Sequence, residues 1–597
     1  MSIMLTNENI SSFVGDVLPL RLTGVDDRRA EVRWSVSGDA VTLRDFSDDP
    51  EYGFTTGVLL SLVKVGEATV KAEYDGKIYT ASVSVRDMKH YESSPEMRYF
   101  FGDMHDHTSM NHKRLEFATH NYGDVADYVK YQREDGRLDF AVISDHAGVT
   151  NDHDFYRGFE LATEGGNNDG VIIFAGAESE ITYTERDRFD ILHRLSGEIV
   201  TINSAGYSNT KSWDDFYRDM RYTPDAVAIF AHPHVVGFST NGIWNFNFAV
   251  NNTPRMLEIA RGMEMGNGAD REENLIHEYA YHTALDAGFR LSTTCGSDSH
   301  GGRWGYDIMP GKTVIMAPEK SRETFLDALR SNRFYATESG NVKLAYSVNG
   351  KYAPCDLDNS SSYEFRVNIS SFSPDESTVP TLLEVISDYG KPVYTTVIDS
   401  EGEISFAISS DTARYFYLRL IDREGRKTWS PPVFTGRAYD ENKSIDLSPI
   451  DMSTVIASVD GERVDRVING DPFDSYMTKG PSESILLDLG KVRSVSAVGY
   501  YPHIVLRGKD NGPDWTTSME SKHILAEYSV EYSVNGEKFI ECASGRAGTL
   551  GAENIISFER VEARYIRFNA ISSIGSASLR ENYRDTPVKI ANLSLFS

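Results

Sequence analysis

Cysteine is scarce in this chain, and long apolar runs are missing. Its 597 residues include three cysteines, Cys295, Cys355 and Cys542, which lie far apart and form no CxxC pair. This spacing argues against a disulfide framework and against a zinc site made of thiolates. No stretch reaches the roughly 18 apolar residues that a membrane span requires, so we expect no span. Residues 1–9 show no basic segment followed by an apolar core, so no signal peptide is visible.

Basic residues are outnumbered, because 60 lysines and arginines stand against 89 aspartates and glutamates, for a formal net charge of −29. This charge argues against nucleic acid as the main partner, since binding a polyphosphate requires a concentrated basic face. A small phosphorylated substrate is still compatible with this charge, because a bound metal ion can supply local positive charge. The length of the chain predicts several domains.

The sequence pattern divides the chain into four parts. Residues 1–87 and 341–437 alternate polar and apolar positions as short strands do, and so do residues 445–597, after a polar stretch at 438–444. In residues 95–340, short apolar runs alternate with helical stretches. We therefore predict a multidomain chain in which an α/β domain with a parallel sheet, open or closed into a barrel, is flanked by β domains.

Twelve of the fifteen histidines lie between residues 105 and 300, and several of them follow a strand-like apolar run. In α/β folds the carboxyl ends of the strands meet at one rim, so polar residues at these ends are expected to converge. A single histidine at a strand end is usually structural, but five polar strand ends in succession indicate a metal site. Imidazoles and carboxylates without cysteine suit Zn²⁺, Mn²⁺ or Fe²⁺.

As a series, these strand ends resemble the polymerase-and-histidinol-phosphatase (PHP) superfamily. The chain reads HxHT at 105–108, SDH at 144–146, GxE at 176–178, AHP at 231–233 and GSDSH at 296–300. The resemblance implies a distorted (β/α)7 barrel with two or three metal ions, which hydrolyses phosphoesters with a metal-bound hydroxide. Residues 264–268 and the β segment ending at Trp429-Ser430-Pro431 resemble the carbaryl-hydrolase-like branch.

The flanking β domains carry resemblances of their own. Residues 1–87, with the strand around Trp34, resemble a bacterial Ig-like β-sandwich. Residues 445–597, with strands at 528–533 and 563–568, resemble the discoidin, or coagulation-factor C-type, jelly roll. The second resemblance implies carbohydrate binding. Such modules are typical companions of exported bacterial enzymes, so a periplasmic or secreted location is expected.

Carried over motif by motif, the PHP resemblance implies nine metal ligands. Glu178 is expected to bridge two ions and to act in catalysis with Asp298, while Arg303 is either a surface residue or a grip for an anionic substrate. His112 stands where the family usually has the aspartate of an SDG triplet, and the match at His193 is the loosest. The expected ligands are His105, His107, His112, His146, Glu178, His193, His232, Asp298 and His300.

We therefore predict a metal-dependent hydrolase with two or three divalent ions (Zn, Mn or Fe), and specifically a phosphoesterase that acts on phosphomonoesters or phosphodiesters. The expected substrate is a small-molecule or glycan-linked, surface-associated ester. Hydrolysis of a carboxylic or carbamic ester is the alternative within the same class. In a hypothesis of another class, the barrel is only a scaffold and the protein is a non-catalytic glycan-binding protein.

Overall fold

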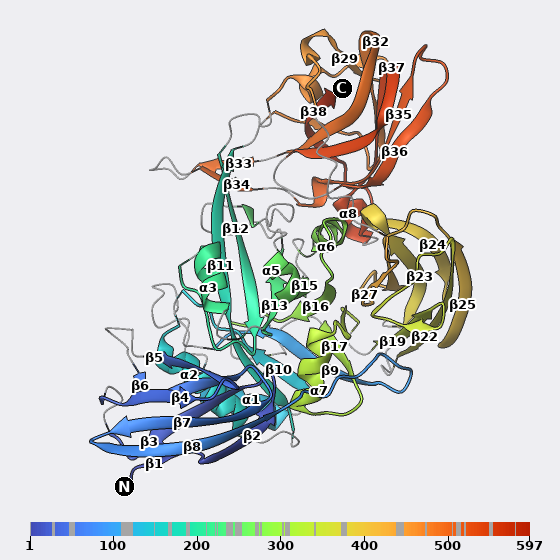
Figure 1. Cartoon of the computed structure of the whole chain (residues 1–597). Helices are drawn as coiled ribbons and strands as arrows, with labels where there is room; N and C mark the ends of the chain where they lie inside the picture. The colour runs from blue at the N-terminus through green and yellow to red at the C-terminus, as the bar shows by residue number, and fades with distance from the viewer. Residues whose placement is uncertain are drawn as a thin grey trace.

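The computed structural model contains four structural units in chain order, coloured from blue to red in Figure 1. Within the residues it describes, no helix combines the length and the apolar character that crossing a membrane requires. It describes all residues apart from 1, 27–29, 47–53, 109–122, 136, 149, 165–169, 187–191, 211, 221–222, 224, 234–242, 245–253, 269–273, 275–276, 301–303, 305–310, 340–341, 372–378, 438–446, 472–473, 504, 509–514, 519–520, 548–552 and 579–580.

The N-terminal unit is a β-sandwich, as predicted. Its strands are β1 (Met4–Leu5), β2 (Asn9–Phe13), β3 (Val17–Thr23), β4 (Arg33–Ser37), β5 (Val41–Phe46), β6 (Phe54–Leu62), β7 (Gly66–Tyr74) and β8 (Lys77–Arg86). They form two sheets, β1-β3-β6-β5 and β2-β8-β7-β4. Alternate residues such as Val70 and Val83 fill the core between the sheets. Asp75 and Gly76, at φ of 50° and 71°, make the tight turn between β7 and β8.

The α/β unit follows and carries the histidine-rich segment. Its strands are β9 (Arg98–Asp106), β10 (Phe140–Ile143), β11 (Ile172–Arg186), β12 (Leu192–Ile202), β13 (Val227–Ala231), β14 (Ile243–Trp244), β15 (Ala260–Asn267), β16 (Ser292–Gly296), β17 (Lys312–Ala317) and β18 (Phe334–Thr337). Its helices are α1 (Val125–Asp135), α2 (Asp152–Thr163), α3 (Trp213–Met220), α5 (Pro254–Ile259), α6 (His277–Asp286) and α7 (Arg322–Arg330). β10 and β13 are buried along their whole length, which explains their continuous apolar sequence.

The sheet of this unit is mixed rather than parallel, which corrects the sequence prediction. β9, β10 and β11 are parallel neighbours, and so are β13, β15 and β16. β12 lies between the two groups and runs antiparallel to both β11 and β13. The cause is local, because β11 continues to Arg186 and pairs with β12 as a long hairpin instead of crossing back through a helix.

The two ends of the seven-strand run β16-β15-β13-β12-β11-β10-β9 come together. The N–H of Asp298 donates to the carbonyl of His105 at 2.8 Å, and Asp106 and Ser299 form a parallel bridge. The first and last strands of the run therefore meet beside the histidines. Because the seven strands are not all parallel, the distorted (β/α)7 PHP barrel stays a prediction.

The β accessory unit continues the same sheet. Its elements are β19 (Val342–Val348), β20 (Lys351–Tyr352), β21 (Cys355–Asp356), β22 (Ser362–Ser371), β23 (Pro380–Ser387), η4 (Asp388–Gly390), β24 (Lys391–Val397), β25 (Gly402–Ser409), β26 (Tyr415–Asp422), β27 (Lys427–Trp429) and β28 (Val433–Phe434). β18 pairs with β27, so β27, β26, β23 and β24 extend the central sheet. The separate sheet β20-β19-β22-β25 shares an apolar core with these strands around Phe365 and Phe416.

The C-terminal unit is all β, as predicted, and antiparallel. Its strands are β29 (Ile456–Val459), β30 (Glu462–Arg463), β31 (Tyr476–Met477), β32 (Glu483–Pro502), β33 (Val505–Gly508), β34 (Trp515–Ser518), β35 (Leu525–Ser533), β36 (Ile540–Arg546), β37 (Asn554–Ser573) and β38 (Lys589–Phe596). Its short helices are η5 (Met452–Thr454), η6 (Asp465–Ile468), η7 (Ser521–His523), α8 (Ile574–Ala577) and η8 (Glu581–Tyr583). The 20-residue strands β32 and β37 pair with each other through two register shifts.

The N-terminal sandwich is joined to the α/β unit through buried contacts. The Nε–H of Arg322 in α7 donates to Oδ1 of Asp16 at 3.0 Å, and both side chains are almost fully buried. Val17 and Phe46 of the sandwich share an apolar cluster with Ala147 and Ala177. Since Ala147 follows His146 and Ala177 precedes Glu178, the sandwich packs against the segments that carry these two side chains.

The C-terminal unit is likewise packed against helix α6. Tyr279 of α6 lies in an apolar cluster with Ile524, Ala526 and Ile574 of the C-terminal unit. Arg546, at the end of β36, lies over the ring of Tyr279 at 5.8 Å from its centroid. The unit is therefore held against the α/β unit by apolar and charged contacts, and not only by the chain that connects them.

Candidate metal centre

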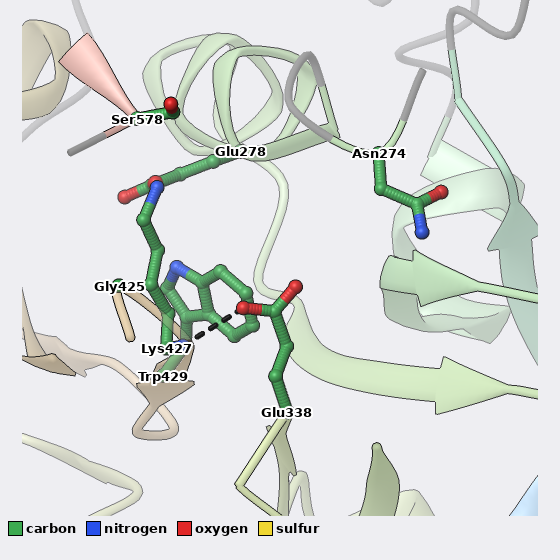
Figure 2. A pocket seen from close by; sticks show the side chains of 7 residues that line it. All are labelled: Asn274, Glu278, Glu338, Gly425, Lys427, Trp429 and Ser578. Atoms are coloured by element: carbon green, nitrogen blue, oxygen red, sulfur yellow. Dashed lines mark hydrogen bonds and ion pairs between the residues drawn. The ribbon is translucent and has the colours of Figure 1, made fainter. Parts of the chain in front are cut away.

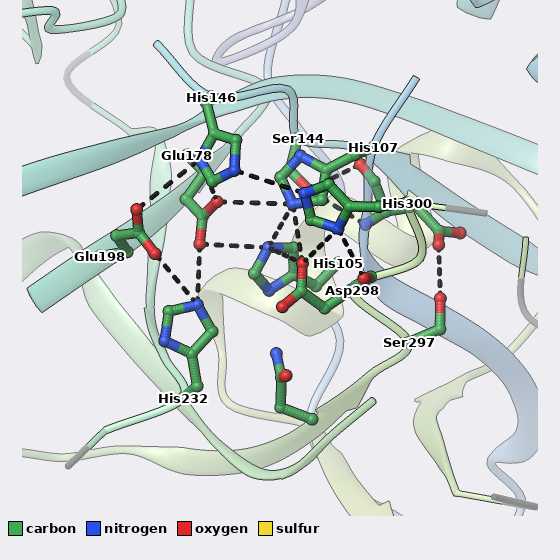
Figure 3. Close-up of polar contacts among 12 residues, drawn as sticks. His105, His107, Ser144, His146, Glu178, Glu198, His232, Ser297, Asp298 and His300 are labelled. Atoms are coloured by element: carbon green, nitrogen blue, oxygen red, sulfur yellow. Dashed lines mark hydrogen bonds and ion pairs between the residues drawn. The ribbon is translucent and has the colours of Figure 1, made fainter. Parts of the chain in front are cut away.

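Seven of the predicted ligands come together at one rim of the α/β unit (Figure 3). His105 and His107 come from the end of β9, His146 follows β10, Glu178 lies in β11, His232 follows β13, and Asp298 and His300 follow β16. They form overlapping groups of three whose nitrogen and oxygen atoms all lie within 4.8 Å of one another. One such group is His107, His146 and His300, and another is His105, Glu178 and His232.

Glu178 occupies the middle of this cluster and is 1% exposed. Its Oε1 lies 3.2 Å from Nε2 of His105 and 3.1 Å from Nε2 of His232. Its Oε2 lies 2.8 Å from Nδ1 of His146 and 3.4 Å from Nε2 of His107. One carboxylate therefore faces four imidazoles, as a ligand that bridges two cations would.

The contacts between imidazoles test whether these residues fit metal ions. Nε2 of His105 lies 3.0 Å from Nε2 of His107, and Nε2 of His146 lies 3.4 Å from Nε2 of His300. Two such nitrogens can share at most one proton, so at least one nitrogen of each pair is unprotonated and could serve as a metal ligand. Imidazole nitrogens that converge among carboxylates, without cysteine, suit Zn²⁺, Mn²⁺ or Fe²⁺. The residues present therefore fit the implied ions.

Glu198 is a member of the cluster that the sequence analysis did not predict. Its Oε2 lies 3.2 Å from Nε2 of His232, and its Oε1 lies 3.6 Å from Nδ1 of His146. The hairpin register explains its position: Glu178 pairs with Val200 and Glu180 pairs with Glu198, so Glu198 shares the face of Glu178. His146, Glu178 and Glu198 form a further group of three potential ligands.

His193 does not lie beside Glu178, which corrects the prediction that it is a ligand. In the hairpin His193 pairs with Glu185, seven positions along β11 from Glu178. At about 3.3 Å per residue this separates the two backbone positions by roughly 23 Å. The predicted ligand His112 and the predicted anion grip Arg303 lie outside the described residues.

The charges of the cluster shift the pKa values of its histidines in the metal-free protein. Burial lowers the pKa of His146, but Glu178 and Glu198 outweigh it and raise the value to about 9. For His105, burial again opposes the carboxylates, which raise its pKa well above the usual value. The pKa of His107 is lowered well below the usual value by burial and by the neighbouring His300 and His146.

The histidines in turn lower the pKa values of two carboxylates of the cluster. Burial raises the pKa of Glu178, but His105 and His146 outweigh it and lower the pKa well below its usual value. The pKa of Asp298 is lowered in the same way by His105 and His107, against burial. Glu198 differs, because burial and the charge of Glu178 together raise its pKa. The centre of the cluster thus holds carboxylate charge that cations can neutralise.

Two residues of the cluster have an unusual backbone conformation. His232 has a φ of 26° and Asp298 a φ of 48°, in a region that residues other than glycine rarely adopt. Such strain persists only where surrounding contacts impose it, and it is concentrated at functional sites. The N–H of Asp298 is held by the carbonyl of His105, which ties the end of β16 to the end of β9.

A small cavity lies elsewhere, where the α/β, accessory and C-terminal units meet (Figure 2). It measures about 10 Å³, room for roughly one water molecule, and is too small for a substrate. Glu278 of α6 forms ion pairs there with Lys427 at 3.1 Å and with Arg419 at 2.5 Å. The lining residues are Asn274, Glu278, Glu338, Gly425, Lys427, Trp429 and Ser578.

No protein-family model matches the sequence, and no curated protein matches it. Solved structures similar to the chain include CpGH89CBM32-5 from Clostridium perfringens in complex with GalNAc-beta-1,3-galactose, at 18% identity and a TM-score of 0.19, covering 25% of this chain and 100% of that one. They also include the family 32 CBM of Clostridium perfringens NanJ in complex with galactose, at 20% identity and a TM-score of 0.19, covering 25% and 99%. A fragment of a putative chitobiase from Bacteroides thetaiotaomicron has 16% identity and a TM-score of 0.20, covering 26% and 94%. At these identities and TM-scores the similarity assigns no activity to the chain.

Proposed function

We propose that this protein is a metal-dependent hydrolase that cleaves phosphoesters at the cluster around Glu178, in a PHP-type barrel. The observation that supports this proposal is the convergence of five imidazoles and three carboxylates, contributed by six different strands or their ends. Nε2 atoms of neighbouring histidines face each other at 3.0 and 3.4 Å, so their ring nitrogens converge on the same small space as the carboxylates. The order of the motifs along the chain matches the PHP pattern.

The residues would hold two or three ions, shared through Glu178. When bound, such ions would lower the pKa of a coordinated water and polarise an ester oxygen. His105, His107 and Asp298 form one ligand group, and Glu178 links it to His232. Glu198 and His146 extend the cluster on the other side of Glu178, and His300 closes it beside His107 and His146.

The burial of the cluster indicates from which side a substrate would approach. The side chains of His105, His107 and Glu178 are fully buried. Those of His300, His146 and Asp298 are 35%, 28% and 16% exposed. A substrate would therefore meet His300, His146 and Asp298 first. Of these three side chains, the carboxylate of Asp298 would accept and pass on a proton. Glu178 would act from beneath, as a shared ligand.

Elemental analysis of the purified full chain, followed by a substrate panel, tests the proposal. We expect two or three first-row metal ions per chain, and loss of activity with a chelator. The panel contains p-nitrophenyl phosphate, bis-p-nitrophenyl phosphate and p-nitrophenyl acetate. Turnover of a phosphate substrate supports the proposal, and turnover of acetate alone would replace it with carboxylic ester hydrolysis. Less than one ion per chain after reconstitution would overturn the metal centre and leave a glycan-binding scaffold.

We also propose that the C-terminal unit binds carbohydrate, so that the substrate is a glycan-linked or surface-associated ester. The residue pattern of 445–597, which resembles discoidin-like jelly rolls, supports this part of the proposal. A periplasmic or secreted location belongs with it. A glycan array probed with the full chain tests carbohydrate binding. Binding that survives the chelator would separate it from the metal centre, whereas an array without any bound glycan would contradict it.

A further inference from the structure

Glu264 in β15 is a buried carboxylate that contacts two histidines of the cluster without facing its interior. It is 1% exposed, and its Oε1 lies 2.9 Å from Nδ1 of His105. Its Oε2 accepts hydrogen bonds from the backbone N–H of His232 at 2.7 Å and from Nδ2 of Asn267 at 3.0 Å. The two oxygens therefore serve three donors, which come from β9, from the residue after β13 and from β15 itself.

The first contact determines how His105 presents its ring. The ionised carboxylate of Glu264 can only accept a hydrogen bond, so Nδ1 of His105 carries the hydrogen. In the neutral ring Nε2 then keeps its lone pair, and it is this atom that faces Glu178 at 3.2 Å and His107 at 3.0 Å. A carboxylate behind a metal-ligating histidine orients the ring and raises its basicity as a ligand.

The second contact acts on the backbone of His232. Its φ of 26° is a conformation that a histidine adopts only under constraint. The N–H of this residue is directed at Oε2 of Glu264, and this fixes the backbone position from which the ring reaches Glu178. One carboxylate thus controls the side chain of one histidine and the main chain of another.

The space beside this carboxylate is closed on the side of Gly296. A Cβ added at Gly296 would lie 2.6 Å from Oε1 of Glu264 and would also collide with Cβ of His105. The glycine therefore permits His105 and Glu264 to meet directly beside β16. The absence of a side chain at position 296 is part of the same arrangement.

We propose that Glu264 is a positioning residue for the metal centre, which fixes the Nδ1–H form of His105 and the backbone of His232. The inference rests on the proposed function, because it concerns residues that would bind the ions. Glu264 would bind neither substrate nor metal, since both its oxygens are already engaged by donors.

Glu264→Gln tests this role, because the amide offers one oxygen to three donors. We expect the full-length variant to bind its ions about 10- to 100-fold more weakly than the wild type in a chelator competition. Glu160→Gln in α2 is the matched control, since it removes a buried carboxylate from the same unit but contacts Arg21 and Arg157 instead of the cluster. We expect the control to bind its ions with wild-type affinity.

Glu264→Asp keeps the carboxylate charge on a side chain that is shorter by one methylene. It should therefore restore part of the metal affinity that is lost in Glu264→Gln. It also serves as the test if the glutamine variant does not fold, as judged by circular dichroism of the metal-free proteins. Wild-type metal affinity in a folded Glu264→Gln or Glu264→Asp variant would overturn the inference and leave the metal centre intact. A wild-type chain that binds no metal would instead overturn the proposed function.

Discussion

Oε2 of Glu198 lies 3.2 Å from Nε2 of His232. Glu198 lies in β12 opposite Ala231 of the antiparallel strand β13, directly before His232, and the two residues belong to no common sequence motif. The register of β12 places Glu198 there, opposite Ala231 of β13 and on the face of Glu178, whereas the predicted ligand His193 lies at the far end of the hairpin. The candidate metal centre thus depends on strand pairing as much as on the sequence motifs.

Glu198→Gln should lower the number of ions retained per chain, because it removes the charge that faces His232 and His146. His193→Gln should leave metal content and turnover unchanged, because position 193 is roughly 23 Å away along the hairpin. Elemental analysis after dialysis measures both variants. The opposite result, with loss of metal only in His193→Gln, would restore His193 as the ligand.

Glu178→Gln should reduce turnover by at least about 100-fold, because the amide cannot supply the charge that four imidazoles face. Side-chain size is kept, so a melting curve of the metal-free protein should show a folded chain. Glu160→Gln again serves as the control and should retain full turnover. A Glu178→Gln variant with wild-type kcat would place the active site elsewhere.

Metal binding should strengthen as the pH rises from about 6.5 to about 9. The pKa of His146 is raised to about 9 in the metal-free protein, so an ion must displace its proton below that pH. The stability of the metal-free fold changes with pH in the opposite direction. Protonated His146 stabilises the metal-free fold below about 6.5, and this stabilisation is lost as the pH rises through about 9.

Melting temperatures measured across this range should therefore fall for the metal-free protein, and the stabilisation by added metal should grow. Calorimetry in buffers of different ionisation enthalpy would detect the released protons. His146→Gln should flatten the pH dependence of the metal-free protein. Metal affinity that does not change between pH 6.5 and 9 would contradict the role of His146 as a ligand.

Arg546→Met should loosen the C-terminal unit from α6 and lower the free energy of unfolding of the full chain by about 1–2 kcal/mol. The side chain is 6% exposed and lies 3.8 Å from Glu278, but Glu278 keeps Arg419 and Lys427. Arg564→Met, at an exposed ion pair with Asp488, is the control and should cause no measurable change. Denaturant unfolding measures the stability of both variants and of the wild type. Equal curves for all three would show that the contact of Arg546 with α6 adds nothing to the free energy of unfolding.

The strand-end motifs could be predicted from sequence because each one is local. His105 and His107 are two residues apart in an extended strand, so they share a face without any knowledge of the fold. Their convergence with His146 and Asp298 follows from the common rim of an α/β sheet.

Glu198 and Glu264 could not be predicted in the same way. A glutamate in an alternating strand reads as a solvent-facing residue, and only the pairing of β12 with β13, which sets Glu198 opposite Ala231, brings Glu198 beside His232. Glu264 acts on His105, 159 residues earlier in the chain. The mixed sheet was missed for a related reason, since the apolar pattern of β12 does not show its direction. Contacts that depend on register or on distant segments leave no local signal.

Asp16 leaves the ribosome 306 residues before its buried partner Arg322. At roughly 5–20 residues per second, this is a delay of about 15–60 s. During that interval the N-terminal sandwich can fill its own core around Val58 and Val83, before Arg322 is available to Asp16. We therefore expect the first domain to fold before α7 emerges and covers Asp16.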